Sequence, residues 1–442
     1  MTRSTTPANK QVRATISKLL ASFGSEKEIQ QYLKRYSDLD SDQFAIIKIG
    51  GATLQSDLEQ LTSSLIFLQQ VGLTPIVVHG AGPQLSAELA ERGIDSEIRD
   101  GLRVTSPAVL QAARQVFMRE NLALVKALRD AGTRAVSITS GVFETELLES
   151  GKYGMVGEIS KVHLDPVRHS VESHVIPVLS PLGETADGQI VNVNADVATN
   201  ALVRAVAPLK IIFLTGTGGI LDAQEKIIPS INLATDYERL MRQDWLHSGM
   251  RLKLEQINTL LREIPPTSSV SITQPALLAQ ELFTHRGSGT FVRLGEKIAV
   301  HRDWNAIDQT RLREALESSF GRRLAQDYTD KAELEAAYIS DSYRAAALVV
   351  RGGPVPRLDK FAVTDKAKGE GLGTALWRRM RNEHPKLFWR ARPDNPINRF
   401  YFQNCDGCIK GEDWNVYWYG LDDMGLISRC VDHANSAQET LY

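Results

Sequence analysis

The chain reads Phe44-Ala45-Ile46-Ile47-Lys48-Ile49-Gly50-Gly51 near its beginning, an apolar run that stops at two glycines. Short runs rich in β-branched residues are typical of buried strands. Glycine directly after a strand permits a tight turn or a close approach of the backbone to a ligand. The pattern recurs in the run 75–79, which ends at His79 and is followed by Gly80-Ala81-Gly82-Pro83. The proline is suited to the first turn of a helix. Both places therefore predict a strand, a glycine turn and a helix in succession.

Strand-like and helix-like stretches alternate around these two turns. The expected strands are Phe44–Ile49, Pro75–His79, Arg134–Thr139, Val175–Leu179, Lys210–Thr215 and Ser269–Thr273. The expected helices are Leu54–Gln70, Gln84–Arg92, Pro107–Ala131, Ala195–Val206 and Met250–Glu263. This alternation predicts an α/β fold with a mostly parallel sheet sandwiched by helices. The stretch Glu146–Val162, with glycines near its centre, predicts an inserted hairpin.

The regular pattern lapses between residues 293 and 306, which predicts a boundary between two domains. Beyond it we expect a helix from Ile307, strands near Tyr338–Val350 and Leu358–Val363, and a glycine-rich turn before the helix Thr374–Arg381. The expected division is an N-terminal arm and helix at 1–40, an α/β domain at 41–292, a linker at 293–306 and a smaller domain at 307–442.

The charge balance excludes some classes of function. Lysine and arginine number 51 and aspartate and glutamate 53, so the net charge is −2 over 442 residues. This balance argues against a nucleic-acid partner, because binding the phosphate backbone requires excess cationic charge. No apolar run approaches the roughly 18 residues of a membrane-spanning helix, and the three cysteines favour a reducing compartment. We therefore expect a soluble protein with no membrane partner.

The first 25 residues allow two interpretations. They contain no acidic residue but several Arg, Lys, Ser and Thr, a composition typical of a mitochondrial leader. Five apolar residues nevertheless have the spacing of one helix face: Val12, Ile16, Leu19, Leu20 and Phe23. We favour a structural arm and a cytoplasmic protein, with a leader and the mitochondrial matrix as the alternative.

Charged and amide side chains follow the expected strands, at the sheet edge where open α/β sheets bind ligands. They come from the stretches around Lys48, Asn192-Val193-Asn194-Ala195-Asp196 and Gly249-Met250-Arg251-Leu252-Lys253. Glycine turns at helix starts can receive phosphates through backbone N–H groups. Two lysines and a carboxylate suit phosphoryl transfer, in which cations and Mg²⁺ stabilise the charge. The alternatives are a helix-capping role for Asn194 and a solvated surface position for Lys253.

This set of residues resembles the amino-acid kinase family, and within it the acetylglutamate kinases. The resemblance implies that Lys48 and Lys253 neutralise the phosphoryl group transferred from MgATP, while Asp196 holds both lysines. It implies that the ATP phosphates are bound by Gly50, Gly51, Gly80, Ala81 and Gly82. It also implies a homo-oligomer, either a dimer or a tetramer, formed through the kinase domains.

The same resemblance assigns the phosphoryl acceptor. Arg103, assisted by Asn192, is implied to bind N-acetylglutamate. The γ-carboxylate of that acceptor is ionised at neutral pH and requires no general base. His79 is therefore expected to have a packing or capping role.

Two positions depart from the family pattern, and one further segment resembles a regulatory site. Ala81 stands where a third glycine is usual, and Thr215-Gly216-Thr217-Gly218-Gly219 lacks an acidic residue common there. The segment with Glu281, Gly287 and Gly289 resembles the arginine-binding segment of feedback-inhibited acetylglutamate kinases. A helix end with a glycine cap is the alternative for that segment.

A second constellation lies in the C-terminal third. Lys368-Gly369-Glu370-Gly371-Leu372-Gly373-Thr374 joins a strand to a helix and resembles the acetyl-CoA loop of GNAT acetyltransferases, which have an α+β fold. The strings Leu358–Val363, Leu387–Arg392 and Asn395–Tyr401 resemble the acetyltransferase domain of vertebrate-type N-acetylglutamate synthases and of bacterial bifunctional synthase/kinases.

This second resemblance implies site residues of its own. The implied acetyl-CoA ligands are Lys368, Gly369, Gly371, Gly373 and Thr374. Lys360 and Arg390, supported by Arg392, are implied to bind glutamate, a task suited to fixed cations. Asn395 and Tyr401 are implied to lie near the thioester, where the Tyr401 hydroxyl could protonate the leaving thiolate.

Together the resemblances imply a bifunctional enzyme of arginine biosynthesis that acetylates glutamate, phosphorylates N-acetylglutamate and is inhibited by arginine. One alternative is a synthase whose kinase domain only binds arginine, and another is a non-catalytic arginine sensor. Cys405, Cys408, Cys430 and His433 have a spacing that resembles a zinc site. We expect no such metal, because a buried strand intervenes at 414–419.

Overall fold

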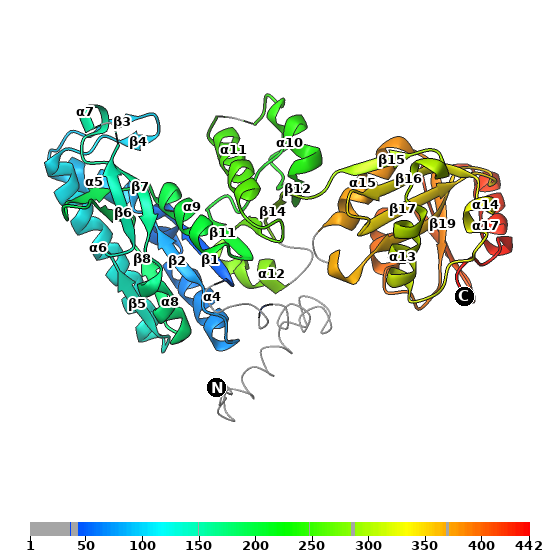
Figure 1. Ribbon diagram of the computed structural model, residues 1–442, viewed down its shortest axis with the longest axis horizontal. Helices are drawn as coiled ribbons and strands as arrows, with labels where there is room; N and C mark the ends of the chain where they lie inside the picture. The colour runs from blue at the N-terminus through cyan, green and yellow to red at the C-terminus, as the bar shows by residue number, and fades with distance from the viewer. Residues whose placement is uncertain (1–35, 37–42, 149, 247, 284–287, 368–370) are drawn as a thin grey trace. The chain divides into compact units, whose positions relative to one another are not determined.

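The computed structural model describes residues 36, 43–148, 150–246, 248–283, 288–367 and 371–442. It divides into two compact units, the first comprising 1–233 with 237–294 and the second 234–236 with 295–442 (Figure 1). The arm and helix expected at 1–40 lie outside the described residues except for Tyr36, whose hydroxyl donates to the carbonyl oxygen of Leu282 at 2.6 Å. None of the helices described is long and apolar enough to cross a membrane.

The first unit has an eight-stranded sheet in the order β12-β14-β13-β11-β1-β2-β8-β5. Its strands are β1 (Ala45–Ile49), β2 (Ile76–His79), β5 (Ala135–Ile138), β8 (Ile176–Leu179), β11 (Lys210–Leu214), β12 (Ser230–Asn232), β13 (Ser269–Thr273) and β14 (Thr290–Arg293). Every neighbouring pair is parallel except β13 with β14. The mostly parallel sheet predicted from the alternation of elements is confirmed.

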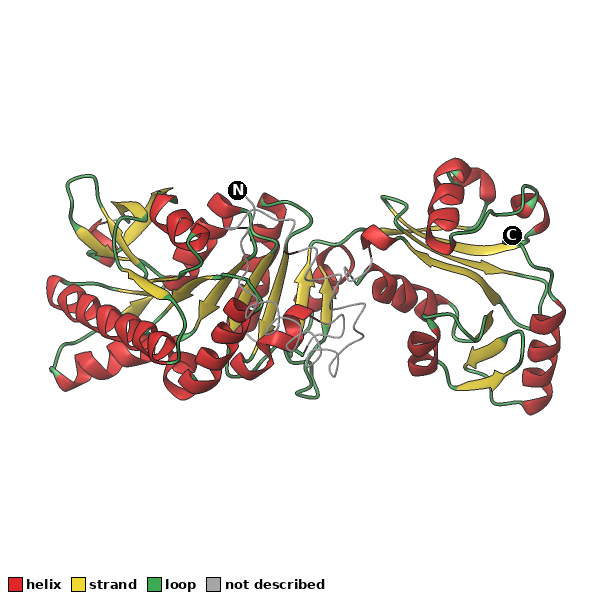
Figure 2. Cartoon of the chain, turned by 90° about the horizontal axis from the view of Figure 1, so that it is seen from below, coloured by secondary structure: helices red, strands yellow, loops and turns green. Residues whose placement is uncertain are grey.

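Helices cover both faces of this sheet (Figure 2). They are α3 (Gly51–Ser56), α4 (Leu58–Gln70), α5 (Gly82–Glu91), α6 (Pro107–Asp130), α8 (Asp165–Glu172), α9 (Ala195–Val206), α10 (Leu233–Met241), α11 (Ser248–Glu263) and α12 (Leu278–Phe283). Successive residues of β1 point to opposite faces of the sheet. Ile47 packs in the cluster that includes Leu65 of α4. Ile46 packs on the other face with Leu202 of α9 and Leu254 of α11. The helix expected at 54–70 is in fact two helices that meet at Asp57.

A small four-stranded sheet, β10-β9-β6-β7, accompanies the main sheet. The hairpin expected at 146–162 is confirmed as the antiparallel pair β6 (Phe143–Leu147) and β7 (Gly157–Val162), with the short helix α7 (Ser150–Tyr153) between them. The other strands are β9 (Leu182–Glu184) and β10 (Ile190–Asn192). A two-stranded ribbon is formed by β3 (Ile98–Arg99) and β4 (Leu102–Arg103).

The second unit has a seven-stranded sheet in the order β15-β16-β17-β18-β19-β21-β20. Its strands are β15 (Ile298–His301), β16 (Leu334–Ser340), β17 (Ala345–Val350), β18 (Arg357–Val363), β19 (Leu387–Ala391), β20 (Gly407–Lys410) and β21 (Asn415–Tyr419). Its helices are α13 (Gln309–Phe320), α14 (Tyr328–Lys331), α15 (Leu372–Glu383), α16 (Asn398–Asn404) and α17 (Met424–Ser436). The single strand expected near 338–350 is therefore two strands, β16 and β17, paired antiparallel.

The expectation of irregular structure throughout 293–306 is wrong. Residues 298–301 form β15, which pairs with Ala337–Ser340 of β16 at the edge of the second sheet, and Trp304–Ala306 form a 3₁₀ turn. Every residue of β15 is half-buried. A four-residue edge strand with no fully buried face carries too weak an alternation to be recognised from sequence.

Two irregularities of β18 shape the second site. Its parallel pairing with β19 is confined to Arg357 with Phe388 and Leu358 with Trp389, so the two strands separate beyond Leu358. Opposite β17, Leu348 pairs with Lys360 while Val349 pairs with Leu358, which leaves Asp359 as the extra residue of a β-bulge. A bulge turns the side chain of the extra residue away from the regular alternation.

Candidate active sites

The register of the main sheet gathers the charged groups of the first candidate site. Lys48 of β1 pairs with Phe213 of β11, so both side chains emerge on one face of the sheet. Lys48 Nζ lies 2.9 Å from Oδ1 of Asp196, in the first turn of α9. Lys253 Nζ, from α11, lies 5.1 Å from the centre of the Phe213 ring. These three charged groups expected from the sequence therefore share one face of the sheet.

The environment of Lys253 disfavours its positive charge. Burial, and next the charge of Lys48, lowers the pKa of Lys253 from 10.5 to about 8, while Asp196 acts in the opposite direction. Two ammonium groups beside one carboxylate leave the site with excess positive charge. An incoming anion relieves this imbalance, and the Lys253 side chain is not the solvated surface lysine of the alternative interpretation.

The two glycine turns pack against each other. A Cβ at Gly51 would lie 2.7 Å from Oε1 of Gln84 and 2.9 Å from Cα of Ala81, so only glycine fits there. Nε2 of Gln84 donates to the carbonyl oxygen of Gly51 at 2.7 Å, which ties α5 to the first turn. At Gly82, in contrast, nothing lies within 4 Å of the Cβ position, so the start of α5 borders open space. Gly50 and Gly80 follow β1 and β2 directly, as expected.

Ala81 is accommodated without strain. It precedes α5 with a φ of −145°, which an L-residue adopts readily, and it is 1% exposed. Its side chain belongs to an apolar cluster with Leu85, Leu89 and Val109. The methyl group that replaces the usual glycine hydrogen is therefore part of the core.

His79 lies in a buried polar cluster beneath the second turn. Its Nδ1 lies 3.4 Å from the Gly80 carbonyl oxygen, and its Nε2 lies 3.2 Å from both Asn121 Nδ2 and Ser180 Oγ. Burial lowers the pKa of His79 to about 4, so the ring is neutral at physiological pH. This agrees with the packing role expected for His79. Sequence reasoning missed Asn121, whose apolar helix neighbours give no signal of a buried amide.

The residues expected to bind the phosphoryl acceptor are linked through Thr105, which sequence reasoning also missed. Arg103 donates to Ser96 Oγ at 2.6 Å and to Ser86 Oγ at 2.7 Å. Asn192 Nδ2 donates to Thr105 Oγ1 at 3.1 Å, and that hydroxyl donates to the carbonyl oxygen of Arg103 at 2.8 Å. Arg103 and Asn192 thus belong to one hydrogen-bonded group.

In the segment expected to bind arginine, the helix residue Glu281 contacts the chain again at residues 288 and 289. Glu281 is 5% exposed, and its Oε2 accepts the N–H groups of Ser288 at 2.8 Å and Gly289 at 3.3 Å. A Cβ at Gly289 would lie 1.9 Å from the carbonyl oxygen of Ile272, which excludes any larger residue. Gly287 lies outside the described residues.

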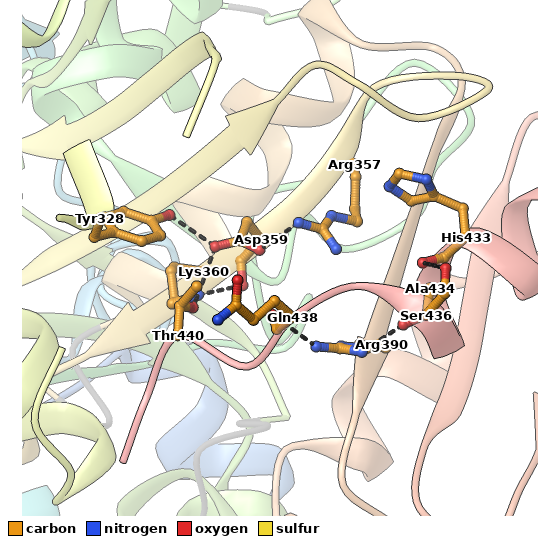
Figure 3. A network of polar contacts seen from close by, with 10 residues as sticks. All are labelled: Tyr328, Arg357, Asp359, Lys360, Arg390, His433, Ala434, Ser436, Gln438 and Thr440. Atoms are coloured by element: carbon orange, nitrogen blue, oxygen red, sulfur yellow. Dashed lines mark hydrogen bonds and ion pairs between the residues drawn. The ribbon is translucent and has the colours of Figure 1, made fainter. Parts of the chain in front are cut away.

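The second candidate site is organised around a buried carboxylate at the β18 bulge (Figure 3). Asp359 accepts hydrogen bonds from Lys360 Nζ at 2.5 Å, Arg357 Nη2 at 2.8 Å and the Tyr328 hydroxyl at 2.7 Å. Burial opposes ionisation of Asp359, but the charges of Lys360 and Arg357 and these hydrogen bonds outweigh it and lower its pKa to about 2. Asp359 thereby fixes the ammonium group of Lys360, which is 5% exposed.

Arg390 and Arg392, on β19 and just beyond it, share an aromatic partner. Both guanidinium carbons lie 4.0 Å from the centre of the Trp414 ring. Arg390 also donates to the carbonyl oxygens of Ala434 at 2.5 Å and Gln438 at 3.3 Å. Arg392 forms an ion pair with Glu439. The three cations expected at this site all lie near the separating ends of β18 and β19.

Tyr401 and Asn395 lie at helix α16. Tyr401 is 6% exposed within an aromatic cluster that includes Phe361 and Trp377. Burial, with a further effect of Tyr417, raises the pKa of Tyr401, so its hydroxyl keeps its proton. Asn395 Oδ1 accepts the N–H of Ile397 at 3.2 Å, immediately before the helix.

The acetyl-CoA loop is described only from residue 371 onward, so Lys368 and Gly369 lie outside the described residues. Gly371 precedes α15 with a φ of 68°, a conformation that favours glycine. A Cβ at Gly373 would lie 3.2 Å from Val363, so glycine permits close packing of α15 on β18. Thr374 lies in the first turn of α15.

The cysteines with zinc-like spacing lie in different surroundings. Cys430 is buried with Phe388 and Val416, whereas Cys405 and Cys408 pack against another core cluster. Among the described residues, no group of three or more His, Cys, Asp and Glu side chains could hold a metal ion.

Comparison with known proteins assigns both units. Residues 43–267 match the amino acid kinase family, and residues 299–437 match the N-acetyltransferase (NAT) of N-acetylglutamate synthase. An acetylglutamate kinase of Xanthomonas campestris pv. campestris is 56% identical over 424 residues, which cover 95% of this chain and 100% of that protein. The mitochondrial N-acetylglutamate synthase of Homo sapiens is 33% identical over 407 residues, covering 90% of this chain and 73% of that protein.

A solved structure of similar fold is N-acetylglutamate synthase from Neisseria gonorrhoeae, complexed with coenzyme A and N-acetyl-glutamate. The TM-score is 0.62 at 17% identity, with 90% of this chain and 98% of that chain covered. At this identity the likeness concerns the fold alone. The family models and the sequence relatives show that the chain belongs to the amino acid kinase family and carries, after its kinase domain, the N-acetyltransferase domain of N-acetylglutamate synthase.

Proposed function

We propose that the protein is a bifunctional enzyme of arginine biosynthesis, with N-acetylglutamate synthase and acetylglutamate kinase activities in separate domains. The observation that carries this proposal is the set of Lys48, Asp196 and Lys253 on one face of the kinase sheet. A domain kept only for regulation has no need of two lysines near one carboxylate. We place the kinase domain at 41–294 and the acetyltransferase domain at 295–442, close to the division into compact units.

In the kinase reaction, a γ-carboxylate oxygen of N-acetylglutamate attacks the γ-phosphorus of ATP. The bond from that phosphorus to the β,γ-bridging oxygen breaks, which releases ADP and leaves an acyl phosphate. Lys48 and Lys253 stabilise the negative charge on the transferred group, and Asp196 holds Lys48 at 2.9 Å. The turns at Gly50–Gly51 and Gly80–Gly82 supply backbone N–H groups for the phosphates.

The donor set supports Mg²⁺ bound together with ATP rather than in a protein cage. Asp196, whose side chain is 42% exposed, is the carboxylate at this site nearest Lys48. Mg²⁺ commonly uses one or two carboxylates together with substrate phosphates and water. When bound with ATP it would neutralise phosphate charge, while Arg103 and Asn192 orient the acceptor.

In the synthase reaction, the deprotonated amine of L-glutamate attacks the acetyl carbonyl carbon of acetyl-CoA. The carbon–sulfur bond breaks, and the Tyr401 hydroxyl protonates the leaving thiolate. Lys360, Arg390 and Arg392 attract the two carboxylates of glutamate. Beyond their two paired positions, β18 and β19 offer backbone N–H and C=O groups to the amide-containing arm of acetyl-CoA. The start of α15 receives the pyrophosphate of acetyl-CoA.

Three finer features belong to the same proposal. Arginine binds at Glu281 of the kinase domain and inhibits the enzyme. Kinase domains of two or four copies associate. The protein acts in the cytoplasm, which agrees with the cysteine content.

A direct test measures both reactions in one purified preparation. We expect coenzyme A release that requires L-glutamate and ADP release that requires N-acetylglutamate. Coenzyme A release without ADP release would leave the kinase domain as a regulatory module. Absence of both, with arginine still bound, would leave an arginine sensor.

A further inference from the structure

All three cations expected to bind glutamate contact a single stretch of the chain, residues 434–440. Figure 3 shows the contacts of two of them, Lys360 and Arg390. Thr440 Oγ1 accepts a hydrogen bond from Lys360 Nζ at 2.7 Å. The Glu439 carboxylate pairs with Arg392, and the carbonyl oxygen of Gln438 accepts from Arg390. The groups that would receive a substrate carboxylate are therefore already engaged by the protein itself.

The two parts of this stretch differ in how firmly they are packed. Ala434, whose carbonyl oxygen accepts from Arg390, is a fully buried residue of helix α17. Residues 438–442, here named the strap, follow the helix and are half-buried or exposed. The strap is attached by backbone hydrogen bonds of 3.0 Å that join Arg323 with Tyr442 and Ala325 with Thr440. A short edge segment held by few exposed hydrogen bonds opens far more readily than the core does.

The geometry at Lys360 makes displacement of the strap necessary. The Lys360 side chain is 5% exposed, and its ammonium group donates to Asp359 and Thr440. Asp359 is fixed by Arg357 and Tyr328, so it cannot give way to a ligand without leaving their donors unpaired. The Asp359 carbonyl oxygen also lies 3.5 Å from Lys360 Nζ, and the side chain has almost no exposed surface. A carboxylate therefore reaches Lys360 by taking the place of the Thr440 hydroxyl.

At Arg392 the competition is between like groups. Its present partner is the side-chain carboxylate of Glu439, the same functional group that glutamate carries. The two side chains are 34% and 41% exposed, so this ion pair exchanges with solvent and with other anions at little cost.

We propose that the strap is an internal occupant of the glutamate site, which the substrate displaces when it binds. This inference rests on the proposed synthase function. Without substrate, Thr440 accepts a hydrogen bond from the buried ammonium group of Lys360, and Glu439 forms an ion pair with the more exposed Arg392. With substrate, the carboxylates of glutamate replace both groups, and the strap separates from 323–325. The apparent affinity for glutamate is then reduced by the fraction of molecules with a closed strap.

The test uses two nearly isosteric variants of the full-length enzyme. Glu439→Gln removes the charge that competes for Arg392, and Thr440→Val removes the hydroxyl that Lys360 contacts. We expect each to lower the KM for glutamate about two- to fivefold, and the double variant to lower it about tenfold, because each contact removed is of ordinary strength. The kcat and the KM for acetyl-CoA should be unchanged.

Two further variants serve as controls. Gln438→Ala retains the main-chain carbonyl that contacts Arg390 and should behave as wild type. Leu441→Ala removes a side chain that packs against the apolar cluster containing Leu324, without touching a cation, and should also lower the KM for glutamate.

The outcomes separate the inference from the function on which it rests. An unchanged or raised KM for glutamate in the double variant, with normal coenzyme A release, refutes the proposal that the strap competes with glutamate. The strap would then only line the site. A wild-type enzyme that releases no coenzyme A with glutamate overturns the synthase function as well.

Discussion

Kinase activity should depend on pH through Lys253. Its environment lowers the pKa of this lysine from 10.5 to about 8, a displacement worth about 3 kcal/mol at about 1.4 kcal/mol per pKa unit. A lysine with a lowered pKa loses its charge at a lower pH than an ordinary lysine. The kinase kcat/KM for MgATP, which reports the enzyme before MgATP binds, should therefore fall as pH rises through about 8 and approach a tenfold loss per pH unit above it.

The assay is ADP release at low MgATP and saturating N-acetylglutamate, measured between pH 6.5 and 9.5. Lys253→Arg keeps a positive charge throughout this range, so the variant should lose the alkaline decline even if its overall rate is lower. Acetyl transfer in the same samples is the control, because its rate should rise with pH as the glutamate amine deprotonates. An alkaline decline of the same midpoint in Lys253→Arg would refute the assignment to Lys253.

Three further predictions concern other contacts. Asp359→Asn should lower the free energy of unfolding by about 3–5 kcal/mol, because it breaks a buried ion pair at Lys360; chemical denaturation measures this. In the wild type, Asp359 contributes its full share of the free energy of unfolding above about pH 4, its usual pKa in the unfolded chain. That contribution is lost as the pH falls toward the folded-state pKa of about 2. A denaturation series that shows no such loss in acid would contradict the pairing of Asp359 with Lys360 and Arg357. Arg390→Ala should raise the KM for glutamate at least about tenfold and spare that for acetyl-CoA, and an unchanged glutamate KM would move the carboxylate site elsewhere. Glu281→Ala should shift inhibition of acetyl transfer by arginine about tenfold, whereas superimposable inhibition curves would leave Glu281 as an ordinary helix-end residue.

Strong local patterns made the kinase sheet predictable from sequence. The run that contains Lys48 is apolar, β-branched and closed by glycines, and each of these features is local. The grouping of Lys48 with Asp196 and Lys253 followed from a topological rule, since parallel strands present their carboxyl ends at one sheet edge. The link through Thr105 could not be predicted, because it depends on contacts between residues far apart in the chain.

The second site was less predictable, because its decisive features are exceptions to periodicity. Asp359 and Lys360 are adjacent and would face opposite sides of a regular strand. The bulge of β18 instead brings Lys360 Nζ within 2.5 Å of Asp359. Contacts from Glu439 and Thr440 carry no local signal at all, since they arise only when the end of the described chain pairs with residues 323–325.

The two-site function is tested most directly by a crossed inactivation experiment. ADP release and coenzyme A release are measured in single preparations of wild type, Lys48→Ala and Tyr401→Phe. We expect Lys48→Ala to lose about 10²–10³-fold in ADP release with coenzyme A release near wild type. Tyr401→Phe should lose about 10²-fold or more in coenzyme A release with ADP release near wild type. If either substitution lowers both rates together, the two activities do not reside in two separate sites.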